Sequence, residues 1–184
     1  MTEQLEPATR ARHGFFTRLI GAASFKIDIY EEVEHDQNAT GQAAAVVGLV
    51  AVASAIGGLQ TGLSGFVAGV LGAYLGWALW SGTCYFVGVQ LYDGTADWGE
   101  LLRTIGFAQA PGVLLLLRAA PTMGPFLQAA VFFWMIGTVL VAIRQALDFS
   151  TGRALATALA GFVPYVLAKA VLELSLGISP SVLP

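Results

Sequence analysis

Charged residues are scarce in this sequence. Asp, Glu, Lys and Arg make up only 11% of the 184 residues, while hydrophobic residues make up 56%. A soluble domain usually carries about 25% charged residues, so a single soluble core is not expected. The composition indicates instead a polytopic membrane protein of one domain. The net charge of −3 is too small to indicate a partner by itself.

Cysteine and histidine are nearly absent, which excludes several kinds of site. The single cysteine, Cys84, excludes an intrachain disulfide and a multi-cysteine metal site. The two histidines, His13 and His35, form no zinc-protease motif, and neither a phosphate-binding loop nor a nucleophile elbow occurs. No basic tract carries interleaved aromatic residues, which argues against nucleic acid as a partner. We therefore expect no catalytic residue, no metal and no cofactor, and interpret the protein as non-enzymatic.

Five apolar segments are expected to cross the bilayer, for which about 20 residues suffice. The predicted fold is all-α: a polytopic membrane helical bundle with five transmembrane helices, preceded by an amphipathic interfacial helix. The membrane domain is expected to cover residues 41–177, between a disordered tail over residues 1–12 and a short tail over 178–184. The five segments are residues 41–59, 63–91, 101–117, 126–147 and 154–176.

The third segment is the least regular of the five. Gln109 stands near its middle, and Pro111 and Gly112 interrupt it. Proline removes a backbone donor and clashes with the preceding turn, which predicts a kink or two half-helices. A re-entrant hairpin is an alternative because the segment is short. We expect a full but kinked span.

Glycines recur along the second segment at alternating steps of three and four residues. This spacing leaves one helix face without side chains, so that another helix can approach closely. We expect a tight helix pair within the chain, and the alternative is a homodimer interface. The five helix-packing glycines are Gly62, Gly65, Gly69, Gly72 and Gly76.

Residues 13–40 are expected to form the amphipathic helix, with an acidic end. Phe15 and Leu19 belong to a set of apolar residues that recur at helical steps, as in a helix that lies on a membrane surface. Arg18 and Lys26 fall between these apolar residues and are expected to face lipid headgroups. The alternative is a short helix packed on the protein's own loops.

The acidic end holds five of the chain's twelve carboxylates, between Asp28 and Asp36. Glu31, Glu34 and His35 are residue types that bind divalent cations. No second cluster of such residues occurs in the sequence, so a metal site is not expected here. Charged groups near the hydrocarbon are usually paired, and we expect partners within the protein.

Positive residues predict the orientation of the chain in the membrane. The N-terminal region carries four of them, and Arg144 and Arg153 lie near the loop between the fourth and fifth segments. With five spans these residues lie on the same side, which we interpret as cytoplasmic. The N-terminus is then expected inside and the C-terminus outside.

This topology places the acidic stretch, the start of the third span and the end of the fourth on one face. We expect Glu31 or Glu34 to contact Arg103 or Arg144, in a salt bridge that docks the amphipathic helix. The alternative is a polar pocket open to the cytoplasmic leaflet. The full candidate docking cluster is Tyr30, Glu31, Glu34, Arg103, Gln109, Arg144, Gln145 and Asp148.

Three patches of sequence carry a family resemblance. They are Asp28-Ile29-Tyr30 followed by Glu-Glu-Val-Glu, residues 101–111 (Leu-Leu-Arg-Thr-Ile-Gly-Phe-Ala-Gln-Ala-Pro) and residues 141–148 (Val-Ala-Ile-Arg-Gln-Ala-Leu-Asp). With them the chain resembles the Yip family (Ypt-interacting proteins) in its short prokaryotic form, over about residues 15–177. The resemblance implies five spans, a cytoplasmic N-terminus, a role in membrane organisation and, for a prokaryotic member, the cytoplasmic membrane.

Eukaryotic members of that family are associated with Rab-type GTPases. No long cytosolic region precedes Asp28 here, and Glu31-Glu32 stand where the eukaryotic motif has Gly-Pro, which argues against a GTPase partner. Some prokaryotic members resemble accessory subunits of transport complexes. We expect a protein that organises the membrane or partners another membrane protein, with lipids, such a protein or a second copy as partners. The alternative is a small transporter or lipid-handling protein whose pocket lies near Arg103, Gln109, Pro111 and Arg144.

Overall fold

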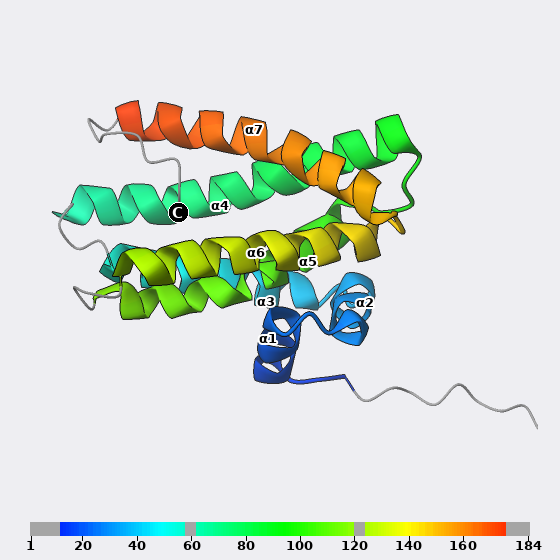
Figure 1. Cartoon of the computed structure of the whole chain (residues 1–184), viewed down its shortest axis with the longest axis horizontal. Helices are drawn as coiled ribbons and strands as arrows, with labels where there is room; N and C mark the ends of the chain where they lie inside the picture. Colours follow the sequence, from blue (N-terminus) through cyan, green and yellow to red (C-terminus); the bar gives the residue numbers. More distant parts are fainter. Residues whose placement is uncertain (1–11, 58–61, 120–123, 176–184) are drawn as a thin grey trace, which may run out of the picture.

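The computed structural model describes residues 12–57, 62–119 and 124–175, and within these ranges the chain forms helices and loops without a strand (Figure 1). Five helical stretches there are long and apolar enough to cross a membrane, which confirms the predicted polytopic bundle. The two predicted tails lie outside the described residues, except for Arg12. The elements are α1 Phe15–Ala23, α2 Ile27–His35, α3 Ala39–Gly57, α4 Gly62–Tyr85, η2 Phe86–Leu91, α5 Trp98–Ala108, η3 Ala110–Ala119, α6 Gly124–Ala146 and α7 Thr151–Ser175.

Helix α5 is at the centre of the bundle. It contacts α2, α3, α4 and α6, and its residues from Leu101 to Ala108 are almost all buried. An Asp97–Glu100 capping box begins this helix: each residue's carboxylate accepts a hydrogen bond from the other's backbone N–H. Since α5 is surrounded, its polar residue Arg103 must find a partner inside the protein.

The third span consists of two helical halves, as its proline predicts. Helix α5 ends at Ala108, and the chain continues after Gln109 as the 3-10 helix η3. Pro111 lacks the N–H that would continue the α-helix. The Gly112 N–H turns to the Gln109 carbonyl at 2.8 Å, and the Ala108 carbonyl instead accepts a hydrogen bond from the Thr138 hydroxyl at 2.6 Å. Both halves pack against α3 and α6, so η3 continues the path of α5 along the bundle.

The glycine pattern explains only part of the contact between α4 and α7. A Cβ at Gly72 would lie 3.3 Å from Leu172 Cδ2, and one at Gly76 would meet the ring of Tyr165. Both glycines therefore belong to a helix pair within the chain, as predicted. Gly69 differs, because a Cβ there would meet open space. The remaining two, Gly62 and Gly65, lie in the first turn of α4.

The N-terminal region forms two short helices, and the prediction of one amphipathic helix is wrong in this respect. After α1 the Lys26 N–H donates to the Gly21 carbonyl and the Phe25 N–H to the Ala22 carbonyl. This is the Schellman pattern of a helix C-terminus, with Phe25 in the left-handed conformation at φ 59°. Glycine usually occupies that position, so the sequence carries no signal for the break.

Candidate functional site: the N-terminal helix pair and the adjoining cavity

Arg18 is the centre of a buried network that joins α1, α2 and α3. Its side chain is 1% exposed. Its Nε and Nη2 donate to Glu32 Oε1 at 3.0 and 2.7 Å, and Nη2 also donates to Asp36 Oδ2 at 2.7 Å. Its Nη1 donates to the Gln42 side-chain oxygen at 3.0 Å. The prediction that Arg18 faces lipid headgroups is wrong, because α1 turns this residue toward the acids of α2.

The two carboxylates of the network have further donors. The His13 N–H donates to Glu32 Oε1 at 2.8 Å, and Arg12 pairs with Asp36 at 3.3 Å. Burial works to raise the pKa of Glu32, but hydrogen bonds from His13 and Arg18 outweigh it and hold that pKa below its usual value. The pKa of Asp36 is likewise lowered: burial opposes the charge, and the hydrogen bond from Arg18 outweighs it. Both acids are thus charged structural partners of Arg18.

Tyr30 and Arg103 attach α2 to its neighbours through carbonyl groups. The buried Tyr30 hydroxyl donates to the Ala22 carbonyl of α1 at 3.0 Å. The Arg103 guanidinium donates to the carbonyls of Val33 and Glu34 at 3.0 and 2.9 Å. A cation at the C-terminal end of a helix also interacts favourably with the helix dipole. Arg103 therefore docks α2 on α5, as predicted, but through backbone oxygens and not through a carboxylate.

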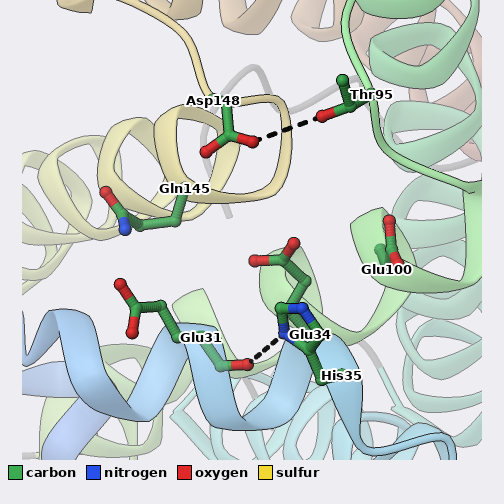
Figure 2. A pocket seen from close by; sticks show the side chains of 7 residues that line it. All are labelled: Glu31, Glu34, His35, Thr95, Glu100, Gln145 and Asp148. Atoms are coloured by element: carbon green, nitrogen blue, oxygen red, sulfur yellow. Dashed lines mark hydrogen bonds between the residues drawn. The ribbon is translucent and has the colours of Figure 1, made fainter.

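A cavity of about 330 Å³ lies between α2, α5 and the end of α6 (Figure 2). It contains four residues of the predicted cluster, and thus confirms that the acidic stretch and the ends of two spans meet. The other three residues were not in that cluster. Its lining is Glu31, Glu34, His35, Thr95, Glu100, Gln145 and Asp148.

The cavity is acidic. Burial, with smaller contributions from Glu100, Asp148 and Glu31, raises the pKa of the half-buried Glu34 to about 7. The pKa of His35 is raised as well, first by its hydrogen bond to the Glu31 carbonyl at 2.9 Å and then by the nearby carboxylates. Within the described residues, no group of three or more His, Cys, Asp or Glu side chains has an arrangement that could hold a metal ion.

The remaining members of the predicted cluster lie apart from the cavity. Gln109 is half-buried at the junction of α5 and η3, and Arg144 is exposed on α6. Among the residues that the structure describes, neither Glu31 nor Glu34 forms an ion pair with an arginine, so the predicted carboxylate salt bridge is wrong. Asp148 lies beyond the end of α6 at φ 53° and accepts a hydrogen bond from Thr95 at 3.3 Å.

One missed residue could have been found from the sequence. Glu100 follows Asp97 by three residues just before an apolar run, which is the signature of a capping box. That signature predicts the start of the third span, and thus that Glu100 lies at the same end of the bundle as the acidic stretch. Thr95 carries no comparable signal, because its position depends on the loop between η2 and α5.

The fold and this site define a class: an all-α, five-span polytopic membrane protein whose N-terminal helix pair packs against the side of the bundle, with α2 nearer to one end (Figure 1). Comparison with protein-family models matches residues 28–172 to the Yip1 domain. The chain belongs to the Yip1 domain family. No match was found among curated proteins or solved structures. Helix α1, with Arg18, precedes the matched residues.

Proposed function

We propose that the protein is a non-enzymatic partner of another membrane protein, or an organiser of the membrane. The observation that carries this proposal is that the polar residues in and around the N-terminal region are bonded to other groups of the protein. Arg18, Glu32 and Asp36 bind one another, and Arg103 binds backbone carbonyls. These groups hold α1 and α2 on the bundle, and a surface that is already ordered loses less conformational entropy when it binds a partner.

Photo-crosslinking in native membranes tests this proposal. A photo-reactive residue replaces Glu31 or Thr95 at the cavity rim, and Leu167 on the exposed apolar face of α7 serves as the control position. Expected are discrete adducts from positions 31 and 95 to one membrane protein or to a second copy of the chain. If both rim positions give only lipid adducts or none, this surface does not bind a protein partner.

The cavity itself favours a second candidate, a small transporter or lipid-handling protein. Its acidic lining would select a cationic or amine-bearing group, such as a lipid headgroup or a small solute. It lies at the end of the bundle, between α2, α5 and α6, and Arg103, Gln109 and Arg144 do not line it. Native mass spectrometry of the purified chain should then detect one retained molecule, which is lost in Glu31→Lys but kept in Arg144→Gln.

The proposed orientation has the N-terminus and the acidic cavity in the cytoplasm and the C-terminus outside, in a prokaryotic cytoplasmic membrane. It is supported by the positive residues of the N-terminal region and by Arg153 at the start of α7, which lies at the same end of the bundle (Figure 1). A reporter fused after Pro184 should be active outside the cytoplasm. Cytoplasmic activity would contradict the orientation.

A further inference from the structure

Helix α1 lies beside the middle of the bundle, while α2 lies closer to its end (Figure 1). The indole N–H of Trp134 donates to the carbonyl of Ala23, the last residue of α1, at 2.8 Å. Trp134 precedes Ala146, the end of α6, by twelve residues, which is about 18 Å at 1.5 Å per residue. The ring of Phe25 also packs on Gly137 of the same helix. The end of α1 is therefore at the level of the middle of α6.

The other end of α1 is also far from the end of the bundle. The ring of Phe15 lies 6.5 Å from the ring of Phe107, between centroids. Phe107 is nine residues after Trp98, the first residue of the third apolar stretch, which is about 14 Å along α5. Both ends of α1 thus contact spans well inside their apolar stretches, deeper than the headgroup level expected for a surface helix.

The outer face of α1 is apolar. Phe16 and Ile20 are one turn apart, and their side chains are 73% and 65% exposed. The charged residue of the helix, Arg18, faces the protein and is neutralised by Glu32 and Asp36. A charge at this depth is costly unless it is paired in this way. Next to the ends of α1, Arg12 and His13 pair with Asp36 and Glu32, and Lys26 lies beyond the turn, at the start of α2.

We propose that α1 is embedded in the hydrocarbon of one leaflet, with Phe16 and Ile20 against lipid acyl chains. Acyl chains fit this face because it continues the exposed apolar surface of α6, where Phe133 is 70% exposed and Ile136 is 43% exposed. The C-terminal carbonyls of α1 are satisfied by the N–H groups of the turn that follows, by the Tyr30 hydroxyl and by Trp134, as hydrocarbon requires. The helix then widens the membrane footprint of the bundle in one leaflet only.

Collision accessibility of nitroxide labels tests this placement. Phe16→Cys, Ile20→Cys, Leu159→Cys and Glu31→Cys are labelled in the full chain and reconstituted into phosphatidylcholine vesicles. Cys84 is fully buried, so the unsubstituted chain is the labelling blank. Leu159, 59% exposed on α7, is the lipid-facing reference, and Glu31 at the cavity is the reference for water.

Positions 16 and 20 are expected to collide with oxygen more often than with a water-soluble nickel complex, at a ratio within about twofold of position 159. A ratio at both positions that matches position 31 would place α1 in water and overturn the proposal. Immobilised labels with little access to either reagent would place a protein surface there, such as a second copy, and would overturn it as well.

Discussion

Arg18 has a charge that the surrounding helices must neutralise. Its guanidinium donates to two carboxylates and one side-chain amide, and only 1% of the side chain is exposed to solvent. Breaking a buried pair costs more than the pair contributes, because the remaining charge has lost its partner. The residue is therefore the most sensitive point of attachment between α1, α2 and α3.

Replacing Arg18 by Gln should lower the free energy of unfolding by about 3–5 kcal/mol, because it leaves the buried Asp36 and the partly buried Glu32 without their main partner. Unfolding in detergent micelles, followed by circular dichroism, measures this loss. The triple variant Arg18→Met, Glu32→Gln, Asp36→Asn should recover at least part of it. Arg144→Gln, at an exposed position of α6, is the control, and an equal loss there would contradict a structural role for the network.

At the scale of elements, α4 and α7 show that a glycine pattern marks a contact only where a neighbouring helix is present. Tyr165 occupies the space beside Gly76, and its ring is stacked on Trp80 with centroids 5.7 Å apart. The centroid of the Phe162 ring lies 5.9 Å from that of the Tyr165 ring. Tyr165 therefore has little freedom to move away from an added methyl group.

Gly76→Ala and Gly69→Ala form a matched pair on one helix. Gly76→Ala should destabilise the protein by about 1–3 kcal/mol, because the methyl group meets the Tyr165 ring. Gly69→Ala should be neutral or stabilise by up to about 1 kcal/mol, because alanine has the higher helix propensity and the position is open. Thermal unfolding in micelles compares the two variants. Equal effects would show that α4 and α7 are not tightly packed at Gly76.

At the scale of the whole molecule, the cavity is where three separate parts of the chain place like charges together. Glu34 of α2, Glu100 of α5 and Asp148 after α6 all line it. This arrangement makes the stability of the fold dependent on pH, since burial and neighbouring carboxylates raise the pKa of a carboxyl group.

The pKa of Glu34 is raised from its ordinary 4.5 to about 7. The folded state therefore keeps a proton that the unfolded state releases, and stability should fall as pH rises through this window. His35, whose pKa is also raised, acts in the same direction, because its stabilising charge is lost as pH rises through its raised pKa. Glu34→Gln should thus be more stable than the natural chain at pH 8, by about 1 kcal/mol after solvent screening.

Unfolding midpoints measured in micelles at pH 4.5 and pH 8 check this dependence. The difference between Glu34→Gln and the natural chain should nearly vanish at pH 4.5. Glu31→Gln, at an exposed position on the same helix, should change the midpoint less. A Glu34→Gln difference that is the same at both pH values would show that the proton on Glu34 is not its cause.

The sequence by itself determined the class of fold and which polar residues lie at the same end of the bundle. Apolar segments of spanning length predict the five long helices, since in a membrane the backbone must satisfy its own hydrogen bonds. Pro111 predicts the change from α5 to η3 because proline has no N–H to donate. The order of the spans then placed Glu31, Glu34, Gln145 and Asp148 at one end of the bundle, where they line the cavity.

Only the tertiary structure decided which groups bind one another. Arg103 binds carbonyl oxygens, and every residue has a carbonyl, so the sequence could not single out those of Val33 and Glu34. The rotation of α1 about its axis follows from how α2, α5 and η3 pack around it, and this turned Arg18 inward and left Phe16 outward. Helical periodicity identifies an apolar face and a charged residue, but contacts with the neighbouring helices determine which of them is buried.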